Sequence, residues 1–265
     1  MLRVLDLFSG IGGFSLGLER TGGFSTVAFC ESEPKANAVL AHHWPDVPRY
    51  ADIRELHGQL GATDVICGGF PCQPYSTASA GKRKGAEDDR ALWPEMRRLV
   101  RQIRPAWVIG ENVAGIDSLD LERVVSDLEA LGYEVQPLVI PACAVGHDHR
   151  RDRFWIIGHT DTDGKSKRGV HAKTSRLLYR GPQPARLGKA YGVSAWMGVI
   201  GNSVVPQIVE QIGLAILEAE GIPVPPRGCA PRRSHQLTPA ASSLVAGGFS
   251  EIQILAGDRE ARGGG

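Results

Sequence analysis

The sequence has few features of a secreted, metal-bound or membrane protein. Its 265 residues include five cysteines, an odd number without tight spacing, so we expect no disulfide framework and a reducing cytoplasm. There is no CxxC pair to suggest zinc, and we expect no metal. No apolar run reaches membrane-spanning length, and the N-terminus enters a strand pattern at once, so we expect neither a membrane partner nor a signal peptide.

The sequence also lacks a large excess of positive or negative charge. The formal net charge is +1, which neither favours nor excludes nucleic acid, because only the distribution of charge can do so. Apolar residues make up 42% of the chain, enough for one globular core and a small second lobe. We find no internal repeat.

The segment around Cys72 carries the strongest chemical signal. The apolar residues 64–67 predict a buried strand that two glycines end, and Pro71 and Pro74 then bracket the cysteine. Because proline fixes φ and lacks an N–H, this loop is stiff. A cysteine on a stiff loop at a strand end is a candidate nucleophile if a lowered pKa or a nearby base forms its thiolate. The alternative, a buried structural cysteine, suits Cys67 better.

A glycine-rich turn follows the first expected strand. Residues 2–8 predict a buried strand, residues 9–13 a tight turn and residues 14–20 a helix, which is the opening of a nucleotide-binding α/β fold. The dinucleotide fingerprint requires glycine where Ser15 stands. The pattern therefore disfavours NAD and favours another adenosine-containing ligand. A plain strand–helix turn is the alternative, but it explains one glycine rather than three.

Glu31 ends the second expected strand, residues 26–30. It follows Gly10 by 21 residues, the spacing of an acid that accepts hydrogen bonds from both ribose hydroxyls. A solvated acid on a loop is the alternative. A helix is expected over residues 33–43.

Glu111 follows another buried strand, residues 106–110, after an amphipathic helix at residues 92–104. Because the carboxyl ends of parallel strands share one crevice, we expect Glu111 to face Cys72. The alternative is an acid that caps the helix expected at residues 121–131.

Two arginines precede a later strand, residues 154–157, which follows a strand expected at residues 134–142. Arg151 and Arg153 alternate with period two, so we expect both on one face. A guanidinium suits a pyrimidine carbonyl or a phosphate, and an ion pair with Glu111 is the alternative for one of them.

Two polar stretches interrupt these patterns. Residues 78–90 predict a mobile loop that could close over a substrate, or an ordinary solvated loop. Residues 159–200 carry eight lysines and arginines against two aspartates. Such residues can hold phosphates but need a packed scaffold to read bases.

Together these motifs resemble the cytosine-C5 DNA methyltransferase family. Residues 69–74, Gly-Phe-Pro-Cys-Gln-Pro, resemble its catalytic loop, and residues 6–13 resemble its S-adenosylmethionine loop. Residues 111–113, Glu-Asn-Val, are similar to its second catalytic block. Residues 149–153 are similar to its Gln-x-Arg-x-Arg block, with a histidine in place of the glutamine. Residues 201–206 are similar to its final Gly-Asn-Ser block.

The resemblance implies a fold and a reaction. The fold is α/β, a Rossmann-like, doubly wound, mostly parallel sheet of the class I S-adenosylmethionine-dependent methyltransferases, with a reduced recognition lobe. The reaction is that of a DNA (cytosine-5-)-methyltransferase, in which Cys72 adds to carbon 6 of a flipped cytosine, Glu111 acts at N3 and Arg153 contacts the base. A tRNA-modifying enzyme of this family would keep the same residues. A catalytically silent nucleic-acid-binding subunit is the other alternative, disfavoured because Cys72 and Glu111 are both present.

The resemblance also assigns residues to sites. The implied catalytic residues are Cys72, Glu111, Arg151 and Arg153. The implied contacts with S-adenosyl-L-methionine are Asp6, Phe8, Ser9, Gly10, Gly12, Gly13, Glu31, Asp52, Ile53, Pro71, Leu92, Asn202, Ser203 and Val204. The expected contacts with double-stranded DNA are Gln73, Ser76, Lys82, Arg83, Lys84, Lys165, Lys167 and Arg168.

The same comparison suggests how the chain is divided. Residues 1–158 would form the catalytic and cofactor-binding domain, residues 159–200 a short basic target-recognition region, and residues 201–222 a turn and helix that complete the catalytic domain. We expect residues 223–265 to be a largely disordered tail. Because 42 residues are few for recognition, we expect weak, salt-dependent DNA binding unless an accessory specificity protein supplies the missing lobe. We otherwise expect a cytoplasmic monomer.

Overall fold

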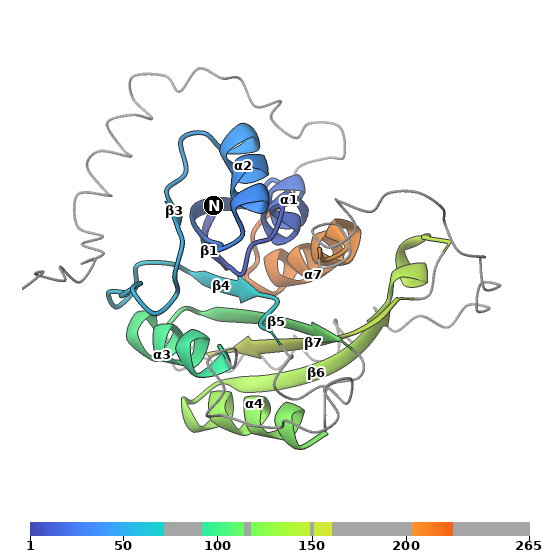
Figure 1. Cartoon of the computed structure of the whole chain (residues 1–265). Coiled ribbons are helices and arrows are strands. Elements are labelled where there is room, and N and C mark those ends of the chain that lie inside the picture. Colours follow the sequence, from blue (N-terminus) through green and yellow to red (C-terminus); the bar gives the residue numbers. More distant parts are fainter. Residues whose placement is uncertain (72–91, 114–117, 149–150, 161–202, 225–265) are drawn as a thin grey trace, which may run out of the picture.

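The fold is a sheet covered by helices on both faces (Figure 1). The computed structural model describes residues 1–71, 92–113, 118–148, 151–160 and 203–224. A seven-stranded sheet has the order β3-β2-β1-β4-β5-β7-β6. Its strands are β1 (Leu2–Leu7), β2 (Phe24–Cys30), β3 (Arg49–Tyr50), β4 (Val65–Gly68), β5 (Trp107–Val113), β6 (Glu134–Pro141) and β7 (Asp152–His159).

The strand order contains a switch point beside β1. The chain moves outward from β1 to β2 and β3, then returns to place β4 on the other side of β1, with all these pairs and β4–β5 parallel. Ligands of such sheets bind where the order reverses, outside the carboxyl ends of the strands. The expected doubly wound, mostly parallel sheet is confirmed, and β7 departs from it by running antiparallel to both β5 and β6.

Two helical layers enclose the sheet (Figure 1). Cluster contacts place two helices on one face and three on the other. The first face holds α3 (Trp93–Ile103) and α4 (Ser118–Ala130), and the second holds α1 (Gly13–Arg20), α2 (Pro34–His43) and α7 (Pro206–Ala219). A short 3₁₀ helix, η3 (Ala142–Val145), follows β6.

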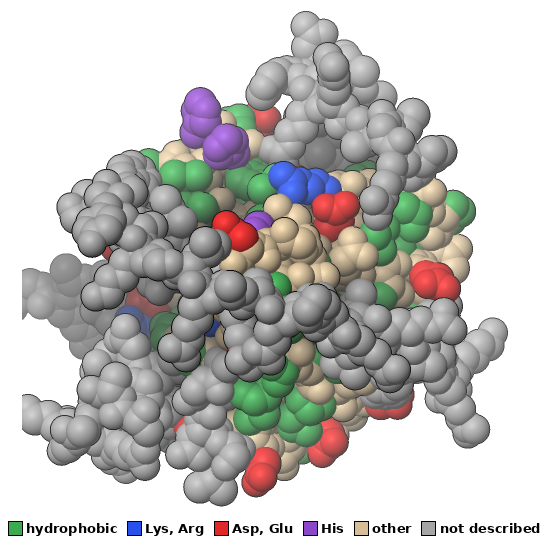
Figure 2. Space-filling model, turned by 90° about the vertical axis from the view of Figure 1, so that its right-hand side faces the viewer, with side chains coloured by type: hydrophobic (Ala, Val, Ile, Leu, Met, Phe, Trp, Pro, Cys, Tyr) green, Lys and Arg blue, Asp and Glu red, His purple; other side chains and the backbone are tan. Residues whose placement is uncertain are grey.

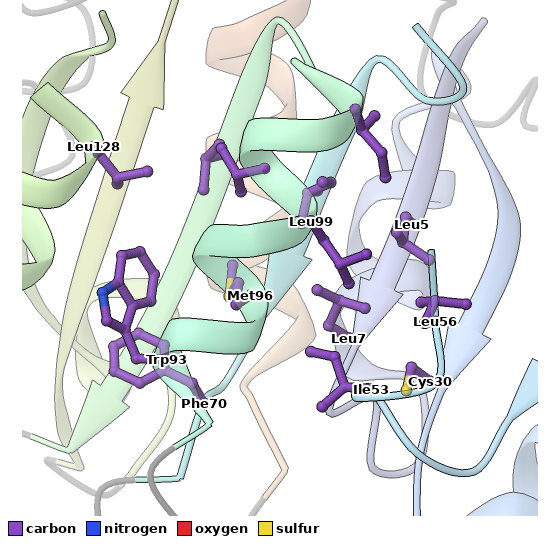
Figure 3. Packing of buried hydrophobic residues seen from close by; sticks show 14 of the residues in the cluster. Leu5, Leu7, Cys30, Ile53, Leu56, Phe70, Trp93, Met96, Leu99 and Leu128 are labelled. Carbon is purple, nitrogen blue, oxygen red and sulfur yellow. The ribbon is translucent and has the colours of Figure 1, made fainter. Parts of the chain in front are cut away.

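The amphipathic helix α3 covers the first face. Its apolar side chains Trp93, Met96 and Leu99 are buried in a cluster with the sheet, as Figure 3 shows. Burying each such side chain contributes roughly 1.5–3 kcal/mol. The Trp93 ring lies 5.2 Å from the Phe70 ring, so α3 also packs on the segment that leaves β4 toward the catalytic loop.

On the second face, the helices α1 and α7 pack against each other. A Cβ built on Gly17 of α1 would lie 2.5 Å from the Pro206 carbonyl oxygen and 2.6 Å from Val209 of α7. Only glycine permits this approach, since no real Cβ comes so near. The helix expected after the Gly-Asn-Ser block therefore returns to the helix of the glycine-rich loop.

Several boundaries differ from the expectations. The strand expected at residues 106–110 continues to Val113, because β7 provides an antiparallel ladder along its whole length. Glu111 is therefore inside β5, and its interpretation as a helix-capping acid is wrong. The following helix begins at Ser118, three residues earlier than expected, and β7 runs from Asp152 to His159.

The exterior is mixed in character. On the face drawn in Figure 2, the coloured hydrophobic side chains occur in small areas separated by polar and acidic ones. Among the helices that the structure describes, none combines the length and hydropathy of a membrane span.

Candidate active site

A buried ion pair lies at the centre of the site. The Nε of Arg153 in β7 is 2.9 Å from Oε1 of Glu111 in β5, and their side chains are 19% and 10% exposed. Burial raises the pKa of Glu111 to about 7, against the opposing charges of Arg153 and Arg151. A carboxyl of this kind exists in both protonation states near neutral pH and can act as an acid.

Arg151 approaches the same carboxyl by a different route. It precedes β7 and has a φ of 31°, so alternation along the strand does not set the direction of its side chain as the sequence suggested. Its Nη2 donates to the Ser203 carbonyl at 2.7 Å. Burial, followed by the charge of Arg153, lowers the pKa of Arg151, and Glu111 acts in the opposite direction.

The segment that leads to Cys72 lies against Glu111. A Cβ on Gly69 would be 3.1 Å from Glu111 Oε2. The Asn112 side chain donates to the Phe70 carbonyl at 3.1 Å, which ties β5 to this segment. These contacts support the expectation that Glu111 faces the cysteine loop, although Cys72 itself lies outside the described residues. This role of Asn112 could not be predicted from local patterns, because only strand pairing brings it beside Phe70.

The cofactor loop has the backbone that its glycines predicted. Phe8, Gly10 and Gly12 have φ values of 53°, 54° and 84°, in the left-handed region that favours glycine. The Ser9 hydroxyl donates to the Asp6 carbonyl at 2.6 Å, and Gly10 N donates to Glu31 Oε2 at 2.7 Å. A Cβ on Gly10 would meet nothing within 4 Å, so this loop borders open space.

Glu31 closes the loop onto the end of β2. Its second oxygen, Oε1, accepts from Glu33 N at 2.7 Å. Each carboxylate oxygen can accept two hydrogen bonds, so capacity remains for ribose hydroxyls. The interpretation of Glu31 as a solvated surface acid is incomplete, since the carboxylate holds Gly10 in place.

The remaining predicted cofactor contacts comprise an apolar set and a partly buried acid, Asp52. Ile53 is buried in the first-face cluster (Figure 3). Phe8 and Leu92 pack against that cluster. Asp52 is occupied by Arg54, whose Nη2 lies 2.8 Å from Oδ2. The hydrogen bond from Arg54 is the first cause of a lowered Asp52 pKa.

Asp6 does not lie on the surface of the loop. Its side chain is fully buried, and Oδ2 accepts from the backbone N and the hydroxyl of Ser15 at 3.2 and 2.7 Å. Asp6 reaches the loop through Ser15 at the start of α1, and its contact with the cofactor stays a prediction.

Ser203 and Val204, the described residues that follow positions 201–202, lie near the glycine-rich loop. A Cβ on Gly13 would lie 2.7 Å from Val204 Cγ2, and Ser203 contacts Arg151 as described. The structure thus places Ser203 and Val204 between the loop and the ion pair. Pro71 is half-buried at the end of a described range.

Other predicted site residues lie outside the described residues. The structure describes residues up to 71 and again from 92, and it describes neither 161–202 nor 149–150. The predictions that remain without a structural account are Cys72, Gln73, Ser76, Lys82, Arg83, Lys84, Lys165, Lys167, Arg168 and Asn202.

The described residues include three cysteines and other side chains of the kinds that bind metals. Within the described ranges, no group of three or more His, Cys, Asp or Glu side chains could hold a metal ion. Cys30, Cys67 and Cys143 are free and buried, and for Cys67 this confirms the structural interpretation.

These features define a class and then a family. A parallel sheet with a switch point at β1, a glycine-rich loop and an acid at the end of β2 define the class I methyltransferase fold. Residues 2–183 match the model of the C-5 cytosine-specific DNA methylase family. The chain belongs to this family.

Curated relatives are longer than this chain. The Type II methyltransferase M.HgiCII of Herpetosiphon aurantiacus is 40% identical over 164 residues, which cover 59% of this chain and 37% of that protein. The Type II methyltransferase M.NgoBV of Neisseria gonorrhoeae is 34% identical over 193 residues, which cover 66% of this chain and 44% of that protein. The matched part thus spans less than half of either relative.

Solved structures with the same fold include two eukaryotic proteins. A variant of DNMT2 from Spodoptera frugiperda has a TM-score of 0.52 at 21% identity and covers 73% of this chain and 57% of that one. The methyltransferase EhMeth of Entamoeba histolytica has a TM-score of 0.50 at 18% identity and covers 63% of this chain and 55% of that one. At these identities, the likeness concerns the fold alone.

Proposed function

We propose that this chain is a DNA (cytosine-5-)-methyltransferase that uses S-adenosyl-L-methionine. The observation that carries the proposal is the buried Glu111–Arg153 pair, which lies against the backbone leading to Cys72. An acid with a pKa of about 7 suits the hydrogen-bond donor that the reaction needs, and Glu111 lies inside β5 against the segment that leads to the proposed nucleophile. Family membership and the Type II relatives support the same activity.

The reaction follows from the chemistry of cytosine. Carbon 5 is a poor nucleophile, so the Cys72 thiolate first adds to carbon 6, which breaks the aromaticity of the ring and makes carbon 5 enamine-like. Protonated Glu111 donates to N3 and stabilises the electron density that the addition moves there, while Arg153 holds the carboxyl and contacts the base. After carbon 5 takes the methyl group, a base removes its proton and the sulfur–carbon bond breaks. The thiolate and the aromatic ring are then restored.

The cofactor side uses the residues of the glycine-rich loop. S-adenosylmethionine, when bound, supplies the methyl group. Glu31 accepts from its ribose, and the loop backbone at Gly10 approaches it closely. Ile53, Phe8 and Leu92 form the apolar wall for its adenine. Both faces of the cytosine ring must be reached, so the base is flipped out of the double-stranded DNA.

The basic segment at residues 159–200 acts as a short recognition region in this proposal. Its phosphate contacts give weak, salt-dependent binding and a short or degenerate target, unless an accessory specificity protein supplies further base contacts. The enzyme acts as a cytoplasmic monomer on bacterial or phage DNA, in the manner that the names of its Type II relatives suggest.

The covalent step can be tested directly. DNA containing 5-fluorocytosine blocks removal of the carbon-5 substituent, so the protein should form a denaturant-resistant complex that depends on S-adenosylmethionine. Cys72→Ala should form none, and Cys143→Ala should behave as wild type, because that cysteine is buried in η3. An adduct that persists in Cys72→Ala would reject the proposed nucleophile. Offering RNA with the same modification separates the tRNA-modifying alternative.

A further inference from the structure

Asp6 is a buried carboxyl with one oxygen in use. It is the last residue but one of β1, and its side chain is completely buried. Oδ2 accepts both the backbone N–H and the hydroxyl of Ser15, at 3.2 and 2.7 Å. Oδ1 is buried and accepts no hydrogen bond from the part of the chain that the structure describes. A buried oxygen without a donor is costly, so its retention needs an explanation.

The groups around this carboxyl do not neutralise it. The charged side chains that act on it are Glu31 at the end of β2 and Glu19 in α1, both acidic. The Cys67 thiol lies across from it in β4, where the strand register pairs the two residues, and this thiol donates to the Leu5 carbonyl at 3.8 Å. The Cys30 thiol of β2 is buried nearby, and the charge of Asp6 contributes to raising its pKa to about 12, after burial and the charges of Glu31 and Asp52.

In the described part of the chain, the favourable partners of the charge are the start of α1 and the Cys67 thiol, whose pKa is raised by burial and then by its interactions with Asp6. Ser15 is the third residue of that helix, whose first residue is Gly13. Backbone N–H groups at a helix start carry partial positive charge and lack partners within the helix. Asp6 therefore supplies the hydrogen-bond acceptor that Gly12, the residue before the helix, cannot provide. The loop of residues 8–12 is thereby held between Asp6 in β1 and Ser15 in α1.

We propose that Asp6 is a positioning residue for the cofactor loop, acting through Ser15, and that its ionisation is coupled to the positive charge of the methyl donor. This inference rests on the proposed function, since it takes the cationic sulfonium of S-adenosylmethionine as the ligand charge. A cation that enters the loop next to β1 compensates a carboxylate on which, among the described residues, only acidic side chains act as charges. S-adenosylhomocysteine differs from S-adenosylmethionine only in lacking the transferred methyl group and, with it, this positive charge.

The coupling has a definite sign. Burial raises the pKa of Asp6 to about 7, opposed by the two hydrogen bonds from Ser15 and assisted by the charges of Glu31 and Glu19. Near neutral pH, the free protein is therefore a mixture of both forms. A nearby cation favours the ionised form, so binding expels a proton and becomes tighter as pH rises. If the sulfonium favours the ionised form tenfold, the affinity rises about tenfold between low and high pH, and about 0.4 proton leaves per cofactor at pH 7.

Calorimetry of cofactor binding tests this coupling. Titrations of the full chain at pH 7 in two buffers with different ionisation enthalpies count the protons released. Wild type should release protons with S-adenosylmethionine and fewer with S-adenosylhomocysteine. Asp6→Asn keeps an acceptor for Ser15 and removes the charge, so it should bind both ligands without that difference. Ser15→Ala should weaken both ligands and keep the difference in proton release.

The outcomes separate this inference from the proposed function. Equal proton release by the two ligands in wild type, or an unchanged difference in Asp6→Asn, would overturn the role of Asp6 while leaving the methyltransferase intact. Absence of binding by either ligand to wild type would overturn the cofactor assignment itself. If Asp6→Asn does not fold, the wild-type comparison of the two ligands still decides the charge coupling, and Ser15→Ala decides the positioning role.

Discussion

Removing Arg153 should destabilise the protein in a way that depends on pH. Arg153→Gln leaves Glu111 buried without its partner at 2.9 Å. At that distance, two unit charges interact by about 6 kcal/mol at an effective dielectric of 20, an attraction that desolvation of both groups offsets. Breaking a buried pair from one side usually costs about 3–5 kcal/mol. At pH 8 the loss in the free energy of unfolding should be smaller, about 1.4 kcal/mol, because the unpaired Glu111 can take up a proton one pH unit above its wild-type pKa of about 7.

The pH dependence follows from the raised pKa of Glu111. Its ordinary value is 4.5, and burial raises the folded-state pKa to about 7. Between these values the folded state binds more protons than the unfolded state, so this group lowers stability by about 1.4 kcal/mol per pH unit as pH rises, roughly 3 kcal/mol in total. At pH 5 the carboxyl is neutral in the folded state with or without Arg153. The deficit of Arg153→Gln should therefore be small at pH 5 and grow as pH rises above 7.

Urea unfolding followed by tryptophan fluorescence at pH 5, 6, 7 and 8 measures this directly. Glu111→Gln is the matched control, because it removes the titrating group and keeps the shape. The double variant Glu111→Gln with Arg153→Gln should lose most of the pH-dependent deficit. If Arg153→Gln is equally destabilised at pH 5 and pH 8, the pair is not the source of the effect and the buried-acid interpretation of Glu111 is wrong.

Two further predictions concern the ligands. Glu31→Ala should weaken S-adenosylmethionine binding by roughly 1.5–3 kcal/mol, the range for hydrogen bonds to charged groups. The control Glu33→Ala removes only the acceptor for Lys35 N at the start of α2, so it should bind the cofactor as wild type does. Equal affinity of the folded Glu31 variant and wild type in calorimetry would exclude ribose binding. On random-sequence DNA at physiological salt, methylation mapping should give a short or degenerate target, and one efficient target of four or more base pairs without a partner protein would contradict the reduced recognition region.

The sequence predicted the parts of the site that local patterns determine. The glycine turn, the acid at the end of the second strand and the buried Cys67 depend on neighbours along the chain, and the structure contains each of them. The position of Glu111 inside β5 could not be predicted in this way. It depends on the antiparallel ladder with β7, whose residues lie more than 40 positions later, with Glu111 opposite Trp155.

The same limit applies to Asp6 and Arg151. The motif suggested that Asp6 touches the cofactor, because a motif gives proximity along the chain and no information on burial. Its side chain turns to Ser15, nine residues later, once α1 packs on the sheet. Arg151 was expected to follow strand alternation, yet its positive φ and its bond to the Ser203 carbonyl come from the return of the chain at α7. Long-range pairing decides the direction of both side chains.

The contacts around α7 connect the two halves of the site. Val204 packs on Gly13 at the cofactor loop, and the neighbouring Ser203 accepts the bond from Arg151 beside Glu111. One short segment therefore contacts both the glycine-rich loop and the Arg151 side chain beside Glu111. A shift of this segment on cofactor binding would move the Arg151 guanidinium relative to Glu111. If the proposed roles hold, the return of α7 to α1 couples the proposed acid Glu111 to the glycine-rich loop through Ser203 and Val204.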